Sequence, residues 1–294
     1  MLIFSGSSNK SLAKKLAKSL SYKLGKVELS RFANNEARVW IKEKKIGRKA
    51  VVMQSLSQPT DHHLIEFCLI CDALKRKGVK EIIGVIPWLG YSKQDKVFRD
   101  GEPLSVKVIA KILQTANLEK IITFDLHNLA ILGFFDIPLI NLSANGLFTE
   151  YFKNKVDENT IVVAPDAGSV KSSSSFAQEL RIDVAYIDKK RDLNSGKVII
   201  KGISGRVKGK NVLIIDDMLV TGSTLIETAK FLKKQRVQSI KVAITHHLYV
   251  PGVQKKIDKS KIDELIVTDT VKQKNKSKKL KILSVTEMLG EAIK

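Results

Sequence analysis

The chain contains little cysteine and no long uninterrupted apolar run. Cys68 and Cys71 are the only cysteines among its 294 residues. No stretch supplies the roughly 18 consecutive apolar residues that a membrane-spanning helix needs, which argues against a helical membrane protein. The opening MLIFSGSSNK also lacks the basic segment, apolar run and small-residue cleavage site of a secretion signal. We therefore expect a globular protein of the cytoplasm.

The two cysteines form a CxxC pair, a spacing that can indicate redox or metal chemistry. They fall inside the stretch 64–74, whose apolar residues recur at helical spacing behind Asp61 or a neighbour as the expected helix cap. This pattern places both thiols on the buried side of a helix, where burial raises a thiol's pKa and makes it inert. We predict structural cysteines, with a reactive pair near His62 and His63 as the weaker alternative.

Acidic residues are scarce relative to basic ones. The chain has 30 Asp and Glu against 51 Lys and Arg, a formal net charge of +21. A nucleic-acid face would require these cations to cluster, because clustered cations release counterions from a phosphate backbone. Only residues 272–281 form a dense run, and the other lysines are spread along the chain. We favour a solvated lysine-rich surface over a nucleic-acid interface, and such a surface also suits anionic small substrates.

The apolar residues form short β-rich runs with helical patterns between them. Segments 105–115 and 224–234 carry apolar residues at three- and four-residue spacing behind Ser or Thr, which predicts crossover helices. Strands that are apolar almost throughout are typical of a parallel sheet covered on both faces. The length allows about two such domains, with segment 133–147 as the expected junction. The predicted strands are 51–55, 81–88, 120–125, 161–166, 184–188, 211–217, 242–245 and 264–269.

The most informative segment is 212–224, VLIIDDMLVTGST. A buried strand is followed at its carboxyl end by two carboxylates, and a loop of Thr221, Gly222, Ser223 and Thr224 then leads into an amphipathic helix. Free backbone N–H groups, hydroxyls and the helix dipole make such a loop a phosphate site. The acidic pair Asp216 and Asp217 could hold vicinal hydroxyls of an attached sugar. The simpler interpretation is that the pair begins a turn and Thr224 caps the helix.

Further motifs run along the whole chain in a specific order. They are FSGSSNKSLA, RFANNEARV, DHHLIEFCLICDALKRKG, IPWLGYSKQDK, GEPLS, DLHNLAILGFFDIP, APDAGS, IDKKR, IDDMLVTGST and LSVTEMLGEAI. With them the chain resembles the ribose-phosphate pyrophosphokinase family, the phosphoribosyl pyrophosphate synthetases, almost from end to end. The resemblance implies an α/β fold of two phosphoribosyltransferase-like domains, each a mainly parallel sheet flanked by helices. The expected domains are 1–142 and 143–278, with a C-terminal segment 279–294 packing on the first.

The family transfers the diphosphoryl group of ATP to the anomeric hydroxyl of ribose 5-phosphate, releasing AMP and serving nucleotide biosynthesis. Charge on the phosphate chain must then be offset by cations and metal. The resemblance implies that Lys189 and Arg191 are a catalytic pair on a mobile loop, 189–197, which closes as a flap. Without the resemblance, a solvated turn would be an equal alternative. It also makes His127 and Asp166 ligands of Mg²⁺, a hard ion that prefers oxygen donors.

The resemblance assigns the two substrate sites as well. For ATP it implies an aromatic residue from a neighbouring subunit, Phe32, and hence a homo-oligomer with an ATP site shared between subunits. Phe32 would otherwise be interpreted as a core residue, and the rest of the ATP segment as an exposed charged loop. The other implied ATP residues are Asn34, Glu36, Lys93, Gln94, Asp95 and Arg99. Ribose 5-phosphate is assigned to Asp216, Asp217, Thr221, Gly222, Ser223 and Thr224.

The chain departs from the family pattern at several positions. Lys93 stands where Arg is common, Asn34 and Asn35 replace Asp-Gly, and Ser169 replaces the second Gly of the pyrophosphate loop. These departures put affinity and regulation in question more than reaction type. Two rival hypotheses remain, a phosphoribosyltransferase that consumes phosphoribosyl pyrophosphate and a non-catalytic regulatory partner on the same scaffold. The chain-long match and the retained catalytic positions argue against both.

Overall fold

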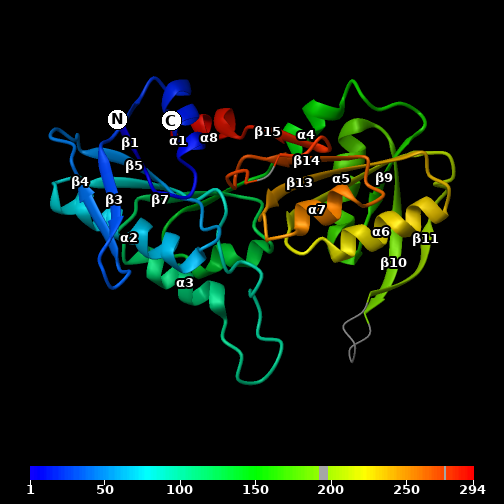
Figure 1. The fold of residues 1–294 in the computed structure, drawn as a ribbon, viewed down its shortest axis with the longest axis horizontal. Helices are drawn as coiled ribbons and strands as arrows, with labels where there is room; N and C mark the ends of the chain where they lie inside the picture. The colour runs from blue at the N-terminus through cyan, green and yellow to red at the C-terminus, as the bar shows by residue number, and fades with distance from the viewer. Residues whose placement is uncertain (192–197, 275) are drawn as a thin grey trace. The chain divides into compact units, whose positions relative to one another are not determined.

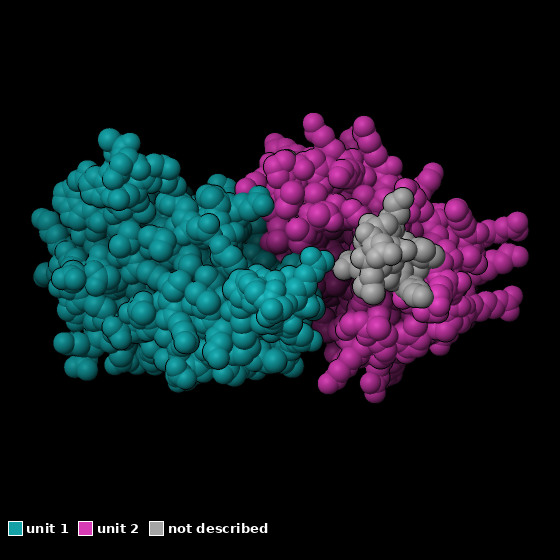
Figure 2. Space-filling view, turned by 90° about the horizontal axis from the view of Figure 1, so that it is seen from below, with its two compact units in different colours: residues 1–143, 269–272, 284–294 teal, residues 144–268, 273–283 magenta. Residues whose placement is uncertain are grey.

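The computed structural model describes residues 1–191, 198–274 and 276–294, except the side chains of 190, 191, 198 and 199. The chain divides into two compact units, which Figure 2 colours teal and magenta. Unit 1 consists of Met1–Ser143, Asp269–Lys272 and Ser284–Lys294, and unit 2 of Ala144–Thr268 and Gln273–Leu283. Neither unit is continuous in sequence, because the chain returns to unit 1 after most of unit 2 is complete.

Unit 1 contains a six-stranded parallel sheet in the order β2-β1-β5-β6-β7-β8 (Figure 1). Helices α2 and α3 cover one face and α1 and α8 the other. The strands are Leu2–Ser5 (β1), Lys23–Leu24 (β2), Lys49–Met53 (β5), Glu81–Val85 (β6), Lys120–Phe124 (β7) and Leu139–Leu142 (β8). The helices are Lys10–Ser19 (α1), Thr60–Arg76 (α2), Ser105–Gln114 (α3), Thr286–Ile293 (α8) and the 3₁₀ helix Leu129–Phe134 (η1).

A separate antiparallel hairpin of unit 1 joins β3 (Val27–Arg31) to β4 (Ala37–Ile41). Its turn closes with a hydrogen bond of 3.0 Å from the Phe32 N–H to the Glu36 carbonyl, a normal length for such a bond. Asn35 adopts a left-handed conformation with φ of 71°. Asn tolerates this conformation better than most residues, as expected for the Asn-Asn replacement. The hairpin thus presents its turn residues to solvent.

Unit 2 contains a seven-stranded sheet in the order β11-β10-β9-β12-β13-β14-β15, in which only the β10–β11 pair is antiparallel. The strands are Thr160–Ala164 (β9), Asp183–Arg191 (β10), Val198–Ser204 (β11), Asn211–Leu219 (β12), Ser239–His247 (β13), Glu264–Thr268 (β14) and Leu280–Leu283 (β15). The helices are Asn145–Phe152 (α4), Ala167–Ser169 (η2, 3₁₀), Val170–Leu180 (α5), Ser223–Lys234 (α6) and Val253–Asp258 (α7).

Side chains of successive strand residues in unit 2 enter different cores. Val212 and Ile214 pack with α6 and α7, whereas Leu213 and Ile215 pack with α4 and α5. Because successive residues of a strand face opposite sides of a sheet, a strand apolar throughout must be buried on both faces. This arrangement confirms the expected α/β class and the mainly parallel sheets flanked by helices.

Each of the eight predicted strands corresponds to a strand of the structure, with shifted ends. Sequence reasoning missed the short or half-exposed strands β1, β2, β3, β4, β8, β11 and β15. The expected caps were wrong: α2 follows Pro59 rather than Asp61, α3 begins at Ser105 behind Leu104, and α6 begins at Ser223 behind Gly222. Along the described residues no helix has the length and apolar character needed to cross a membrane.

The cysteines lie within α2, as predicted. Cys71 is buried and Cys68 is half-buried. Burial raises the pKa of Cys68 to about 11 and the pKa of Cys71 well above the usual value for a thiol. Thiols with such pKa values remain protonated at neutral pH, which agrees with the structural assignment.

Candidate active site

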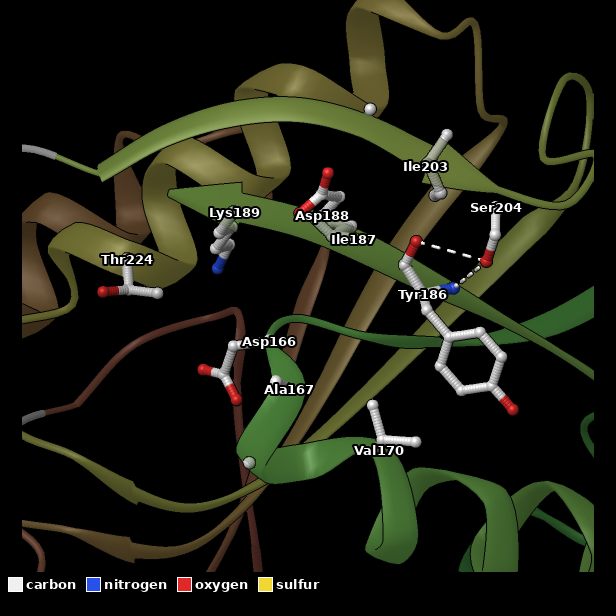
Figure 3. A pocket seen from close by; sticks show the side chains of 12 residues that line it. Asp166, Ala167, Val170, Tyr186, Ile187, Asp188, Lys189, Ile203, Ser204 and Thr224 are labelled. Atoms are coloured by element: carbon white, nitrogen blue, oxygen red, sulfur yellow. Dashed lines mark hydrogen bonds between the residues drawn. The ribbon is translucent and has the colours of Figure 1, made fainter. Parts of the chain in front are cut away.

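A cavity of about 810 Å³ opens at the carboxyl ends of strands β9 and β10 in unit 2 (Figure 3). Lys189 reaches into it from above and Asp166 faces it from the end of β9, while Thr224 lies at the left side of this view. Ligands of open α/β sheets bind beyond this edge. The lining residues are Asp166, Ala167, Gly168, Val170, Tyr186, Ile187, Asp188, Lys189, Gly202, Ile203, Ser204 and Thr224.

Asp166 and Ser169 hold the loop after β9 in a reciprocal capping box. The Ser169 N–H donates to Asp166 Oδ1 over 3.1 Å, and the Asp166 N–H donates to Ser169 Oγ over 3.2 Å. These two bonds satisfy the backbone N–H groups that a helix start leaves unpaired. Ser169 therefore fixes the backbone of this loop and orients one oxygen of the Asp166 carboxylate.

Lys189 lies on strand β10, so the expectation that it begins a loop was wrong. The β10–β11 register shifts between Asp188 and Lys189, and Lys189 pairs with Ile200. Such an irregularity redirects a side chain, and bulges of this kind are common beside active sites. The extended hydrogen-bond ladder with β11 explains why the polar sequence of this segment did not prevent strand formation.

The Lys189 amine is buried without a hydrogen-bond partner among the described residues. Burial lowers the pKa of Lys189, and the nearby charges of Asp166 and Asp216 oppose that change. A buried nitrogen without a partner is costly and uncommon in proteins. Its position in the cavity, with a shifted pKa and carboxylates nearby, makes Lys189 a candidate functional residue.

Arg191 ends strand β10, and its side chain lies outside the described part of the structure. Residues 192–197, the rest of the predicted flap, also lie outside the described residues. The catalytic role of Arg191 and the closing motion of the flap remain predictions.

Asp216 and Asp217 lie within β12, which continues to Leu219 instead of ending at the carboxylate pair as predicted. The Asp217 N–H donates to Asp216 Oδ1 over 3.0 Å. Burial raises the pKa of Asp216 to about 8, with further contributions from the charges of Asp217 and Asp166. The three carboxylates therefore concentrate negative charge that a cation would neutralise.

The loop after β12 leads into α6 at Gly222, whose φ of 73° is left-handed. Glycine adopts this conformation without strain, and no side chain caps the helix start. The hydroxyls of Thr221, Ser223 and Thr224 make no hydrogen bond with any described residue. Free N–H groups and free hydroxyls at one helix start have the chemistry of a phosphate site.

Unit 1 carries the other predicted residues. His127 is exposed in the turn after β7, and the next residue, Asn128, donates from Nδ2 to Asp95 Oδ2 over 2.6 Å. Asp95 is almost fully buried, whereas Lys93 and Arg99 are exposed in the same loop between β6 and α3. The turn of His127, a predicted metal ligand, and the loop of Asp95, a predicted ATP residue, are thus joined within unit 1.

Gln94 has an identifiable structural contact as well. Its Oε1 accepts a hydrogen bond from the Ser105 hydroxyl at the start of α3, and its carbonyl accepts from the Val106 N–H. The backbone N–H groups of Phe98 and Arg99 both donate to Glu102. These bonds position the loop but leave the side chains of Lys93 and Arg99 in solvent.

Phe32 is 52% exposed at the turn of the β3–β4 hairpin. This exposure rules out the alternative that Phe32 is a core residue. The Arg38 guanidinium lies 5.7 Å from the Phe32 ring centroid, within cation–π range. Asn34 and Glu36 are exposed in the same turn. An apolar ring held on a hairpin and left in solvent is suited to stacking with a planar ligand.

The side chains near the cavity include oxygen donors that suit a metal ion. Among the described residues no group of three or more His, Cys, Asp and Glu side chains gathers as a complete metal site. Mg²⁺, however, commonly binds through one or two carboxylates together with substrate phosphates and water. Asp166 lies near Asp216, whose pKa its charge helps to raise, and these carboxylates supply suitable hard oxygen donors.

Sequence reasoning missed the Tyr186 and Ser204 side of the cavity and the role of Asn128. The Tyr186 N–H donates to Ser204 Oγ over 3.1 Å, and the Tyr186 hydroxyl lies 3.1 Å from Ser174 Oγ. This side of the cavity is formed by β11, a strand that the sequence analysis did not predict. Asn128 lies inside the quoted DLHN motif, and its proximity to the predicted ligand His127 was the available signal.

Comparisons with known proteins match nearly the whole chain to one family. Residues 1–116 match the family model described as the N-terminal domain of ribose phosphate pyrophosphokinase, and residues 133–278 match the phosphoribosyl transferase domain. A ribose-phosphate pyrophosphokinase of Campylobacter jejuni is 35% identical over 99% of this chain and 94% of its own. One of Thermotoga maritima is 35% identical over 100% of this chain and 94% of its own.

A solved structure extends the comparison to three dimensions. The phosphoribosylpyrophosphate synthetase of Mycobacterium smegmatis superposes with a TM-score of 0.92 and is 32% identical. The match covers 99% of this chain and 97% of that one. Sequence and structure agree along the full length of both chains, and this chain belongs to the ribose-phosphate pyrophosphokinase family.

Proposed function

We propose that the chain transfers the β,γ-diphosphoryl group of ATP to the anomeric hydroxyl of ribose 5-phosphate, giving phosphoribosyl pyrophosphate and AMP. The observation that carries this assignment is the Lys189 amine, buried without a partner in the cavity that Asp166 and Thr224 also line. An ammonium held there meets the negative charge of a phosphate chain without first giving up a protein partner. Such preorganised electrostatics is the main source of catalysis in phosphoryl transfer.

The acceptor would bind along β12 and the loop that follows. The N–H groups and hydroxyls from Thr221 to Thr224 would hold the 5-phosphate, since these hydroxyls have no other partner among the described residues. Asp216 and Asp217 would accept hydrogen bonds from the ribose hydroxyls. Together these contacts would hold the anomeric oxygen towards the cavity that contains Lys189.

The donor would be bound by the residues of unit 1. Phe32 would stack on the adenine, with Asn34 and Glu36 beside it on the same turn. Lys93 and Arg99 are exposed cations that could hold phosphates, and Gln94 and Asp95 would order their loop. Arg191 would join Lys189 as the second cation of the catalytic pair.

We propose Mg²⁺ as the cofactor, held by Asp166 and His127 with oxygens of the phosphates. When bound, the ion neutralises phosphate charge and polarises the bond that breaks. Asp166 would keep one oxygen oriented by the Ser169 N–H while the other faces the ion. Binding a cation near Asp216 would also favour the ionised form of that carboxylate.

A homo-oligomer in which Phe32 serves a neighbouring subunit's ATP site is part of the proposal. Large apolar side chains are exposed on several unit 1 elements, as an interface requires: Phe32 and Trp40 on the hairpin, Ile65 and Leu69 on α2, and Leu129 on η1. The use of ATP as donor also favours the cytoplasm as the place of action.

Product analysis tests the reaction directly. The pure protein is mixed with ribose 5-phosphate, ATP and Mg²⁺, and the nucleotide product is identified by chromatography. AMP together with a diphosphorylated ribose is the expected result. ADP would indicate an ordinary kinase, and absence of turnover across phosphate and metal conditions would support the non-catalytic alternative.

A further inference from the structure

A chain of polar side chains links the end of β13 to α7 inside unit 2. His247 Nε2 lies 3.0 Å from Gln254 Oε1, and Gln254 Nε2 donates to Asp258 Oδ1 over 2.8 Å. Ser277 Oγ donates to the same Asp258 oxygen over 2.6 Å. His247 is fully buried and Gln254 nearly so. The link therefore runs through the interior.

The backbone determines which nitrogen of His247 carries the proton. The Tyr249 N–H donates to His247 Nδ1 over 2.9 Å, so Nδ1 must be the unprotonated nitrogen. Nε2 then carries the hydrogen and donates to Gln254 Oε1. Burial lowers the pKa of His247 to about 4, which keeps the ring neutral at physiological pH. The Tyr249 ring stacks on His247 with centroids 3.9 Å apart and fixes its plane.

The two elements that this link joins, β13 and α7, both lie against the segment that leads into the loop assigned to the 5-phosphate. His247 pairs with Leu219 in the sheet, and the Leu248 N–H donates to the Leu219 carbonyl over 3.1 Å. On the α7 side, a Cβ placed on Gly222 would meet Ile257 at 3.5 Å and Val253 at 3.6 Å. The loop from Leu219 to Gly222 thus rests on β13 and α7.

We propose that His247 and Gln254 are positioning residues for ribose 5-phosphate: their hydrogen bond holds α7 against β13 and so fixes the phosphate loop at Gly222. The inference rests on the proposed function for its ligand, but the effect on loop order is independent of it. Neither residue touches the ligand. Their effect reaches the site through Val253 and Ile257, which pack beneath Gly222.

A polar link suits this task better than an apolar one. α7 is only six residues long, and apolar contacts alone would allow it to slide or rotate on the sheet. Hydrogen bonds are directional, and a fully satisfied buried network selects one arrangement. An apolar pair of the same volume could preserve stability while losing this selection.

The test uses two disrupting variants of the full chain. Gln254→Met removes the acceptor with little change of shape, and His247→Leu removes the donor. His247→Gln is the conservative variant, because its amide can still donate to Gln254. Ser239→Ala is the matched control: it removes a 2.7 Å hydrogen bond to Asn211 at the opposite end of the same β12–β13 pair.

Three readouts are compared: calorimetric binding of ribose 5-phosphate and of ATP, kcat at saturating substrates, and hydrogen exchange of the amides of 219–226. Gln254→Met and His247→Leu should weaken ribose 5-phosphate binding about three- to tenfold, the usual effect of one lost hydrogen bond. Binding of ATP and kcat at saturation should stay within twofold. Amides of 219–226 should exchange faster. His247→Gln and Ser239→Ala should resemble the wild type in all these measurements.

The proposal is overturned if Gln254→Met folds and both its ribose 5-phosphate affinity and its loop exchange match the wild type. It is also overturned if Ser239→Ala causes an equal loss, since the effect would then be general stability. A wild-type protein that fails to bind ribose 5-phosphate refutes the proposed function instead. In that case loop exchange alone still decides whether His247 and Gln254 order the loop.

Discussion

Asn128 and Asp95 join two separate loops of unit 1 through a 2.6 Å hydrogen bond from an amide nitrogen to a carboxylate oxygen. Asp95 is almost fully buried, so the bond forms away from competing water. Asn128 also accepts from the Ala130 N–H through Oδ1, which starts η1. One amide therefore orders both the loop of Lys93 to Arg99 and the turn of His127.

Replacing Asn128 with Ala should damage ATP binding through this connection. Loss of a hydrogen bond to a buried carboxylate costs about 1.5–3 kcal/mol. We expect KM for ATP to rise several-fold while KM for ribose 5-phosphate is unchanged, measured by steady-state kinetics. Thr115→Ala, which removes a hydroxyl contact at the end of α3, is the control and should leave both constants unchanged. An unaltered KM for ATP in Asn128→Ala would contradict the ordering role.

Lys189→Met should abolish most turnover without loss of stability. The side chain keeps its apolar stem, but the cavity loses the cation that meets the phosphates, and kcat should fall by about a thousandfold. Because the amine is buried without a partner, its removal should leave Tm equal or higher. Lys201→Met, on the exposed face of β11, is the matched control. Near-normal turnover in Lys189→Met would remove this lysine from the mechanism.

Asp216→Asn should stabilise the metal-free protein at alkaline pH. The pKa of Asp216 is about 8 in the folded chain, above its ordinary value near 4, so the folded state retains a proton that the unfolded state releases. Stability therefore falls as pH rises from about 4 to about 8. Asn does not titrate, so its advantage over the wild type should grow across this range, by about 1.4 kcal/mol for each pKa unit that separates the folded from the unfolded state. Urea unfolding in EDTA at pH 5 and pH 9 measures the free energy of unfolding of the variant and of the wild type. If the variant exceeds the wild type by the same amount at both pH values, the prediction is wrong.

Asp217→Ala should weaken ribose 5-phosphate binding while sparing ATP. The variant loses an acceptor for the ribose hydroxyls, and one such hydrogen bond to a charged group is worth about 1.5–3 kcal/mol, or roughly 10- to 150-fold in affinity. Calorimetric titration with each substrate separates the two effects. Asp183→Ala, at the amino end of β10, provides the control. Unchanged saturation behaviour in Asp217→Ala would refute the sugar-binding role.

A shared ATP site predicts complementation between two inactive variants. Phe32→Ala lacks the stacking ring but keeps Lys189, and Lys189→Ala lacks the cation but keeps Phe32. When the two are dissociated, mixed and reassembled, an intact ring from one subunit can serve an intact lysine of its neighbour. The mixture should recover a substantial fraction of wild-type activity, whereas each variant alone should stay low. If mixing restores nothing, Phe32 does not act in trans.

Much of the fold was predictable because apolar periodicity reports burial directly. Strands such as β12 and β13 are apolar almost throughout, and that pattern predicted a parallel sheet, although not which strands are neighbours in it. The edge elements were harder, because β2 has only two residues and β11 is half-exposed. β11 pairs with the preceding strand β10, and β2 pairs with β1. Neither edge strand has the continuous apolar run by which the buried strands are recognised.

The site was predictable in composition but less so in local structure. Asp166, Lys189 and Thr224 do line one cavity. Sequence reasoning placed Lys189 on a loop because KKRDLNSGK is polar, yet tertiary pairing with β11 extends the strand through it. It also ended β12 too early at the carboxylates, since charged residues rarely continue a buried strand. In both cases pairing with a neighbouring strand overrode the local preference.

The interrupted course of the chain through unit 1 affects the order in which the protein can be made. Asp269 binds Lys15 over 2.8 Å and accepts at its carbonyl from Asn9, while α8 packs on α1. During synthesis these partners of α1 leave the ribosome only after nearly all of unit 2. The apolar face of α1, one of the first segments to emerge, therefore stays uncovered until α8 has been synthesised. During this time chaperone binding and aggregation compete with folding. Translation speed and chaperone supply should consequently influence the yield of unit 1 more than that of unit 2.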